Sequence, residues 1–221
     1  MTPQYLLKGA ALALEQCGLL LRDANRLYRL GSYASSIALA AHAHEEMGRY
    51  QILLELWRRA LAGEAFTVEH IRKACSDHVK KQTEGMLAIT FTDDGGRGSD
   101  LGKLIRAQME VQLQSPEWQK LVAQIDQTIE EMKKSIPTDR HKTRMSAIYV
   151  EPNETEWHRP ADITAAEAYA FLLGASNDYS MQHDRYSNLQ EDRQLCDALQ
   201  QWAERPTLVP PEWPTLPQDT Q

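Results

Sequence analysis

An apolar helical segment interrupted by charged residues constrains the fold of this chain more than any other feature. Residues 37–57 read IALAAHAHEEMGRYQILLELW, which begins and ends as an apolar helix. Its two middle turns carry polar and charged side chains where a purely structural helix would continue with leucine or alanine. These are His42, His44, Glu45, Glu46 and Arg49. Because a buried charge must be paired to be tolerated, the sequence predicts a polar patch completed by residues from elsewhere in the chain.

The spacing of apolar residues around this segment predicts a long antiparallel helical hairpin. Thr2 and Pro3 are typical of a helix start, so a first helix is expected to run to about Leu30. Gly31 ends it, and a second helix is expected over residues 33–61. Within the second helix, His44 and Glu45 are expected to pack against the first, whereas Glu46 and Arg49 are expected to form half of the polar patch.

Three further helices are predicted after the hairpin, each starting at a residue that can cap a helix, and a helical stretch is also expected over residues 101–114. The starts are Thr67, Ser115 followed by Pro116, and Thr164 with Glu167 three residues later. The first of these carries His78 in the middle of an apolar face, with Lys81 one turn on. The second is expected to end at Pro137, and the third to continue towards Ala203.

One extended segment is predicted in an otherwise helical chain, at Ala147–Val150. A single short strand cannot form a sheet alone, so it is expected to lie across the helices or to pair with a second copy. The predicted fold is therefore all-α, a long helical hairpin within a multi-helix bundle. We expect one domain over residues 1–204 and a proline-rich, poorly ordered tail over residues 205–221.

The overall charge limits the classes of partner. With 24 basic and 31 acidic residues the net charge is −7, which argues against an extended nucleic-acid surface and leaves room for a small, local RNA contact. The three cysteines are far apart and have no CxxC spacing, so they are expected to be reduced thiols without a structural zinc site. No segment has the pattern of a signal peptide or a membrane span, so we expect a cytoplasmic protein.

The spacing of the residues excludes several classes of functional site. A di-metal helical bundle needs Glu-x-x-His on two helices, and the chain offers only the reversed pair His42 and Glu45. Residues 93–104 are rich in glycine but lack the Ser or Thr that a phosphate-binding loop requires after its lysine. No arrangement for a nucleophilic serine is present. Neither a metal site nor a cofactor is expected.

The reaction class that these residues still allow is acid–base catalysis by a histidine beside cationic groups, as in metal-independent RNA cleavage. There a histidine moves a proton while arginine or lysine stabilises the charge that develops on the phosphate. The predicted catalytic residues are His78, Arg72, Glu46 and Arg49. The predicted substrate-binding residues are Lys81, Arg140, Arg144 and Tyr149.

A structural interpretation of these residues stands beside the catalytic one. A lone histidine on an apolar face, such as His78, is equally compatible with a hydrogen-bonded core residue. Glu46 with Arg49 has the spacing of an ordinary intrahelical ion pair. The basic stretch Arg140–Lys142 has the composition of a solvated turn.

The residues Glu45-Glu46-Met47-Gly48-Arg49 look like the glutamate-glutamate-apolar-glycine-lysine signature of the AbiV family of abortive-infection proteins, with arginine in place of lysine. His78 and Lys81 match a histidine-x-x-lysine element of that family. Arg144 to Val150, followed by Glu151, is similar to its arginine, tyrosine and valine before an acidic residue. The resemblance covers about Leu6 to Ala175.

This resemblance implies membership of the HEPN superfamily of helical domains, many of which are dimeric ribonucleases in phage defence. Their usual mark is an arginine followed after four to six residues by a histidine, as in Arg72 and His78. The implied function is abortive-infection defence that shuts down translation by cleaving RNA. The implied partners are a second copy of the chain, a phage protein activator and a tRNA or mRNA substrate. The alternative is a non-catalytic protein that engages a phage or host protein.

Overall fold

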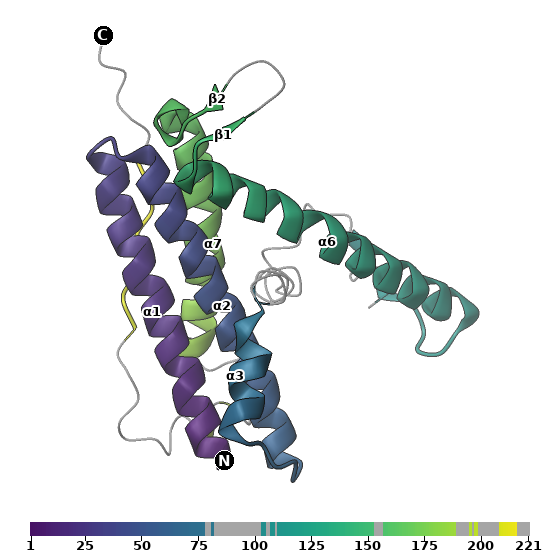
Figure 1. Cartoon of the computed structure of the whole chain (residues 1–221). Helices are drawn as coiled ribbons and strands as arrows, with labels where there is room; N and C mark the ends of the chain where they lie inside the picture. Colours follow the sequence, from purple (N-terminus) through teal and green to yellow (C-terminus); the bar gives the residue numbers. More distant parts are fainter. Residues whose placement is uncertain are drawn as a thin grey trace.

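Three long helices, α1, α2 and α7, lie side by side and form the body of the protein (Figure 1). The computed structural model describes residues 1–77, 81, 103–104, 107–108, 110–152, 157–188, 195, 197–198 and 208–215. Within these ranges, side chains 132–141, 151, 185, 187 and 188 are not described. The fold is all-α, as the sequence predicts, with one small hairpin added.

The helical hairpin is confirmed at both of its helices. Helix α1 spans Pro3–Arg29, and the Thr2 side chain accepts a hydrogen bond from the Tyr5 amide at its start. Helix α2 spans Tyr33–Leu61. The chain reverses between them at Gly31, whose φ of 77° is in the left-handed region that glycine adopts without steric cost. The start of α1 follows from Thr2 and Pro3, and its end follows from Gly31.

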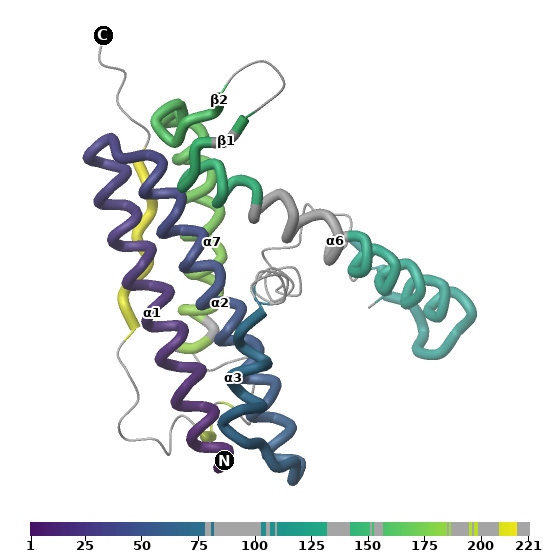
Figure 2. Tube along the Cα trace, in the orientation of Figure 1, coloured from purple at the N-terminus to yellow at the C-terminus, as the bar shows by residue number. Residues whose placement is uncertain are grey.

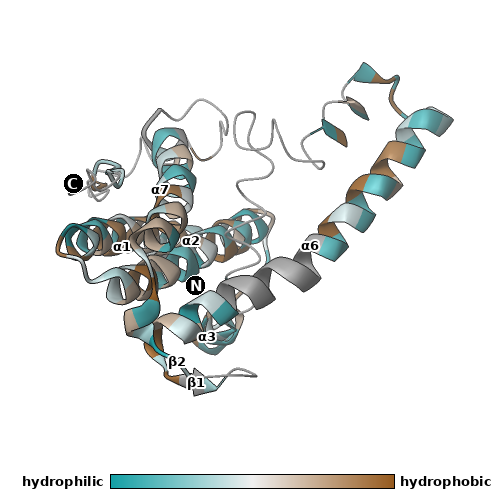
Figure 3. Ribbon diagram, turned by 90° about the horizontal axis from the view of Figure 1, so that it is seen from above, coloured by the Kyte–Doolittle hydropathy of each residue, from teal (hydrophilic) through white to brown (hydrophobic). Residues whose placement is uncertain are grey.

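Helix α2 is the most enclosed element of the bundle. It packs against α1, α7, α6 and α3, which explains why buried residues occur around nearly its whole circumference. Seen from above, α1, α2 and α7 cluster around a common core, and their outer surfaces are mostly hydrophilic (Figure 3). Any charged residue of α2 near its middle therefore faces a neighbouring element. In the part of the chain that the structure describes, no helix combines the length and apolar character needed to cross a membrane.

The third helix is shorter than the sequence predicts. Helix α3 spans Val68–Ser76, and Thr67 caps it by accepting a hydrogen bond from the His70 amide at 3.1 Å. Asp77 has an extended backbone and ends the helix, and the apolar face predicted through His78 lies outside the described residues. This break redirects the chain, and Lys81 next lies against α2.

Helix α6 spans Pro116–Ile148 and projects away from the body of the protein (Figure 1). Ser115 caps it as predicted, through a 3.1 Å hydrogen bond from the Trp118 amide. The predicted end at Pro137 is wrong. A proline inside a helix removes one backbone hydrogen bond but does not prevent the helix from continuing. The turns after it are held against α2 by Arg144 and by the buried Ala147.

The extended segment predicted at Ala147–Val150 is helical at Ala147 and Ile148, and the chain becomes extended only at Tyr149. Strand β1 (Glu151–Pro152) then pairs antiparallel with β2 (Trp157–His158), with Glu151 opposite His158. The short 3-10 helix η1 follows at Pro160–Asp162. The strand thus pairs within its own chain, whereas the sequence predicts a segment that lies across the helices or pairs with a second copy.

Helix α7 spans Ala165–Asn188 and completes the bundle. Its start is the predicted capping box: Glu167 accepts from the Thr164 amide at 2.7 Å, and Thr164 accepts from the Glu167 amide at 3.3 Å. Two of its buried side chains, Leu172 and Tyr179, belong to the core. The predicted continuation towards Ala203 falls largely outside the described residues.

Residues 208–215 lie along α1 and α7 (Figure 2). The Tyr179 hydroxyl donates to the Val209 carbonyl oxygen at 2.6 Å, and Asn25 Nδ2 donates to the Glu212 carbonyl oxygen at 3.1 Å. Gly18 permits this approach, because a Cβ there would fall 2.3 Å from the Tyr179 hydroxyl. These contacts hold residues 208–215 against the bundle, and the poorly ordered tail expected over residues 205–221 stays a prediction. The backbone polar groups that make these contacts are satisfied by buried side chains that no local pattern reveals.

We expect Tyr179→Phe to lower the free energy of unfolding by about 1 kcal/mol, the typical value of one lost hydrogen bond. The change leaves the Val209 carbonyl oxygen without the hydroxyl that now donates to it. Urea unfolding followed by circular dichroism measures the effect. Tyr5→Phe is the control, because Tyr5 is 55% exposed and should be neutral. Equal stability of the two variants would show that residues 208–215 are not anchored in this way.

Candidate functional site: charged residues of helix α2

A buried carboxylate on α2 pairs with two cations from different parts of the chain. Glu45 is 3% exposed. Its Oε2 lies 3.4 Å from Lys81 Nζ, and its Oε1 lies 3.2 Å from Arg144 Nη1 of α6. We call Glu45, Lys81 and Arg144 the ion-pair cluster. It links α2 to the segment after α3 and to α6, so the predicted polar patch exists and its partners come from elsewhere in the chain.

Gly48 lets the backbone of Lys81 reach α2. A Cβ at Gly48 would fall 1.6 Å from the Lys81 carbonyl oxygen and 2.7 Å from its Cα. Glycine costs a helix interior about 1 kcal/mol relative to alanine, so its use here indicates a close backbone contact. Gly48 thereby allows Lys81 to lie beside Glu45, which precedes Gly48 by about one helical turn on α2.

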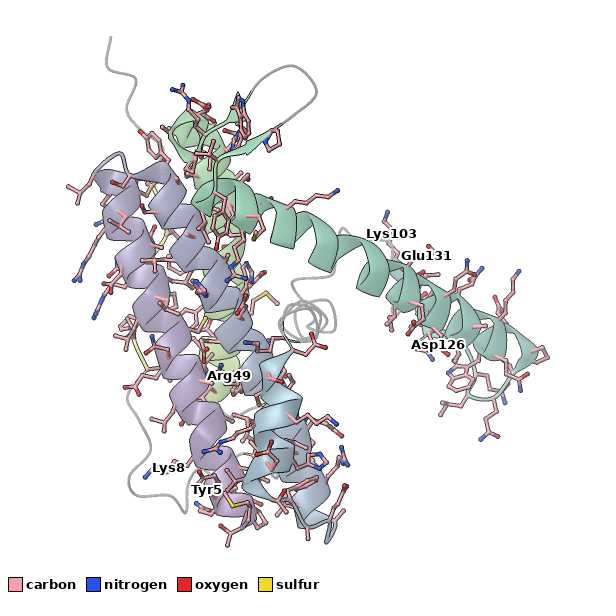
Figure 4. The ribbon with its side chains drawn as sticks, viewed as in Figure 1. Tyr5, Lys8, Arg49, Lys103, Asp126 and Glu131 are labelled. Atoms are coloured by element: carbon pink, nitrogen blue, oxygen red, sulfur yellow. The ribbon has the colours of Figure 1, made fainter. Side chains whose placement is uncertain are left out.

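A second ion pair lies next to this cluster on α2. Arg49 Nη1 is 2.9 Å from Glu46 Oε1 and donates to Glu46 Oε2 at 3.0 Å. The two side chains differ in access to solvent, since that of Glu46 is 15% exposed and that of Arg49 is 39% exposed. Figure 4 shows Arg49 on α2 near α3, far from Asp126 and Glu131 on the projecting half of α6. The Glu46–Arg49 pair is thus the accessible part of the predicted patch.

Burial raises the pKa of the Glu46 carboxyl above its ordinary value of 4.5. The positive charges of Arg49 and Lys81 oppose this shift, and the negative charge of Glu45 adds to it. The net direction is upward because desolvation of the carboxylate outweighs its attraction to the cations. A carboxyl group with a raised pKa is better suited to exchanging a proton near neutral pH than an exposed one.

This shift gives stability a pH dependence with a defined sign. Because the folded state holds the Glu46 proton more tightly than the unfolded state, stability falls as pH rises from 4.5 through the folded-state pKa. We expect Glu46→Gln to remove that part of the pH dependence, so that its stability relative to the wild type increases across this window. Urea unfolding of both proteins from pH 4 to 8 checks this. A constant stability difference over the whole range would contradict it.

The contacts described for His44 and Glu45 join α2 to elements other than α1, next to which the sequence places them. His44 Nδ1 lies 3.6 Å from Asp178 Oδ2, and its ring packs edge-on against Phe171 with centroids 5.9 Å apart. Both of these partners are on α7. Adjacent residues on a helix point about 100° apart. His44 and Glu45 therefore face two different elements, α7 and α6.

Cys17 on α1 is buried in the core, near enough to Glu46 to be affected by its charge. Burial raises the pKa of its thiol well above the usual value, and the carboxylates of Glu46 and Asp178 raise it further. A thiol held protonated in this way is a poor nucleophile. Cys17 therefore contributes packing to the core and takes no part in the chemistry proposed below.

The predicted site residues separate into three groups. Lys81 and Arg144 are brought together by Glu45, with side chains 4% and 18% exposed. They hold the fold together, so the geometry does not favour the substrate-binding role predicted for them. Glu46 and Arg49 pair with each other at the edge of this cluster.

The remaining predicted residues are not joined to these pairs by any described contact. Arg72 is exposed on α3, and Tyr149 is 52% exposed at the end of α6. His78 lies outside the described residues, and so does the side chain of Arg140. The pairing of Arg72 with His78 therefore stays a prediction.

Sequence reasoning missed Glu45 as the centre of the site, although a signal was available. Two adjacent glutamates followed by a glycine inside an apolar helix indicate a buried charge beside a close backbone contact. Among the described residues, no group of three or more His, Cys, Asp or Glu side chains is arranged to hold a metal ion. The two adjacent carboxylates of α2, Glu45 and Glu46, are instead each paired with cationic side chains.

Comparison with known proteins agrees with this arrangement. The family model described as AbiV matches residues 5–180, which include α2, α3, α6 and most of α1 and α7. Searches of curated proteins and of solved structures give no match. The matched range contains all members of the ion-pair cluster and the Glu46–Arg49 pair. The chain therefore belongs to the AbiV family of the HEPN superfamily, which indicates a role in abortive-infection defence.

Proposed function

We propose that this protein halts translation in phage-infected cells by cleaving RNA at the Glu46–Arg49 pair. One observation carries the proposal: a carboxyl group with a raised pKa lies 2.9 Å from a guanidinium that remains more than one third exposed. Such a pair offers a proton acceptor and a stabiliser of negative charge at one place. Family membership supports the defence role but leaves the reaction open.

In the proposed reaction, Glu46 accepts the proton of a ribose 2′-hydroxyl. The 2′-oxygen attacks the adjacent phosphorus, and the bond from phosphorus to the 5′-oxygen breaks. Arg49 stabilises the charge on the phosphate oxygens, and His78, the acid expected from the sequence, gives a proton to the leaving 5′-oxygen. The products are a 2′,3′-cyclic phosphate and a 5′-hydroxyl. The chemistry requires only acid–base groups and a cation.

The proposal includes two kinds of protein partner. A second copy of the chain is the expected dimer partner, and a phage protein is the expected activator. Activation by a phage protein would account for a toxic ribonuclease that leaves uninfected cells unharmed. Size-exclusion chromatography with light scattering tests the dimer directly.

A second candidate function is binding of a phage or host protein without catalysis. One observation favours it: Glu45, Lys81 and Arg144 are largely buried and pair with one another, as in a purely structural cluster. In that case Arg49 and Glu46 contribute only to the surface that a partner protein contacts. The two functions differ in whether RNA is cleaved by the purified protein.

Incubation of the purified protein with total RNA and tRNA in EDTA tests the proposal. We expect specific cleavage by the wild type, at least a hundredfold less by Arg49→Ala, and partial recovery in Arg49→Lys. Arg26→Ala is a matched control, because Arg26 forms an equivalent pair with Asp23 on α1 with the same spacing, at 3.1 Å. Intact RNA at a large excess of folded protein would leave the binding function as the explanation.

A further inference from the structure

A pocket separate from the charged pairs lies where α6, β2 and α7 meet the first half of α2. Its volume is about 430 Å³, within the range of roughly 300–1,000 Å³ typical of small-molecule sites. Ile37, Ile163 and Phe171 supply apolar walls. The Phe171 ring is fixed by its edge-on contact with His44. The pocket therefore offers an aromatic wall whose position is set by the core.

An anionic acceptor stands at the edge of this pocket. Glu167 lines it, and the Thr164 amide and hydroxyl both donate to Glu167 Oε2 at 2.7 Å. These hydrogen bonds lower the pKa of the Glu167 carboxyl, which is therefore ionised near neutral pH. Its Oε1 has no recorded hydrogen bond among the described residues. A ligand carrying phosphate at this edge would be repelled, whereas a neutral group with N–H donors would be attracted.

Two more acceptors adjoin Glu167. His158 Nε2 lies 3.2 Å from the Ser146 carbonyl oxygen, so this nitrogen donates to it, and in the tautomer with one ring proton Nδ1 is an acceptor. The Ser146 hydroxyl donates to the Thr143 carbonyl oxygen at 3.0 Å, which leaves its oxygen free to accept. Both residues line the pocket. Its polar edge is thus composed mainly of acceptors, which match a flat ligand rich in donors.

We propose that this pocket binds an unpaired guanine base of the RNA strand, with the base against Phe171 and its N–H groups directed at Glu167 and His158. Guanine presents adjacent donors, N1–H and the 2-amino group, whereas adenine and cytosine place a ring acceptor beside their amino group. Unpaired bases in RNA are commonly recognised by contact with an aromatic ring together with hydrogen bonds to their edges. This inference rests on the proposed function, because it takes RNA as the substrate.

The distance between the pocket and the Glu46–Arg49 pair allows a single RNA strand to contact both. Ile37 and Arg49 are twelve residues apart on α2, which corresponds to about 18 Å along the helix axis. A few nucleotides of single-stranded RNA span such a distance. The pocket would therefore select a base near the cleaved bond, so that the Glu46–Arg49 pair supplies the chemistry and the pocket supplies the sequence preference.

Calorimetric titration of the full chain with guanosine, inosine and adenosine tests this pocket. We expect guanosine to bind about tenfold or more tightly than inosine, which lacks the 2-amino donor to a charged acceptor. Ala170→Leu fills the pocket and Glu167→Gln removes its charge, so both should abolish the guanosine preference. Ala166→Leu is the matched control on the same helix, outside the pocket. Equal binding of the three nucleosides, or a preference unchanged by Ala170→Leu, would overturn the proposal.

Two oligoribonucleotides, identical except for a single guanine or adenine, distinguish RNA from a free nucleotide. Tighter binding of the guanine oligomer supports the proposal, and binding of guanosine without the oligomer overturns the assignment to RNA. Cleavage assays with the same oligomers separate the two proposals. Cleavage without guanine preference would reject the pocket and keep the ribonuclease, whereas guanine-selective binding without cleavage would reject the ribonuclease and keep the pocket.

Discussion

Gly48→Ala is expected to destabilise the protein by about 3 kcal/mol, the upper end of the usual cost of overpacking a core. The added methyl group would fall 1.6 Å from the Lys81 carbonyl oxygen, and backbone cannot rotate away as a side chain can. Either α2 bends or the Lys81 segment leaves its place. Alanine favours a helix over glycine by about 1 kcal/mol, so the clash must outweigh an intrinsic gain.

Chemical unfolding in urea measures this change, and the chain provides a matched control. Gly174 on α7 is exposed, and a Cβ there would meet nothing within 4 Å. Gly174→Ala should therefore stabilise the protein by up to about 1 kcal/mol. If Gly48→Ala proved as stable as Gly174→Ala, the close contact between Lys81 and α2 would not exist in solution.

Glu45→Gln is expected to cost about 3 kcal/mol or more, because it leaves two largely buried cations without their carboxylate. Lys81 and Arg144 have side chains 4% and 18% exposed, so water can solvate them only after local unfolding. Glu64→Gln is the control, since Glu64 pairs with Arg59 on the surface, with both side chains 43% exposed. An exposed pair of this kind contributes at most about 1 kcal/mol.

A triple variant separates the structural role of the ion-pair cluster from function. Replacing Glu45 with leucine and Lys81 and Arg144 with methionine removes all three charges together, and such replacements are often neutral or stabilising. We expect stability near that of the wild type and retention of the Glu46–Arg49 pair. A cost for the triple variant as large as for Glu45→Gln would show that the cluster contributes more than the pairing of its buried charges.

The parts of the fold that sequence predicts are those fixed by local chemistry. Thr2, Gly31, Thr67, Ser115 and Thr164 each act within a few residues, so the starts of four helices and the hairpin turn follow from the chain alone. The end of α6 depends instead on tertiary contacts. Helix α6 passes Pro137 because its last turns are held against α2, and no local pattern encodes that contact.

The candidate site was predictable in kind and only partly in detail. Charged residues inside an apolar helix indicate that partners exist, and in the structure Lys81 and Arg144 lie beside Glu45 of that helix. Which glutamate they join depends on the rotation of α2 against α6, a tertiary property. The sequence favoured Glu46, whereas the structure pairs both cations with Glu45 and leaves Glu46 to Arg49.

The most direct test of the central claim is the rate of protein synthesis after phage infection, measured by pulse labelling. Cells would express the wild type, Arg49→Ala or the control Arg26→Ala at equal amounts of folded protein, with a phage that the wild type resists. If the Glu46–Arg49 pair is the functional centre, synthesis stops in cells with the wild type and with Arg26→Ala, and continues in cells with Arg49→Ala. An arrest by Arg49→Ala as fast as that by the wild type would contradict the account.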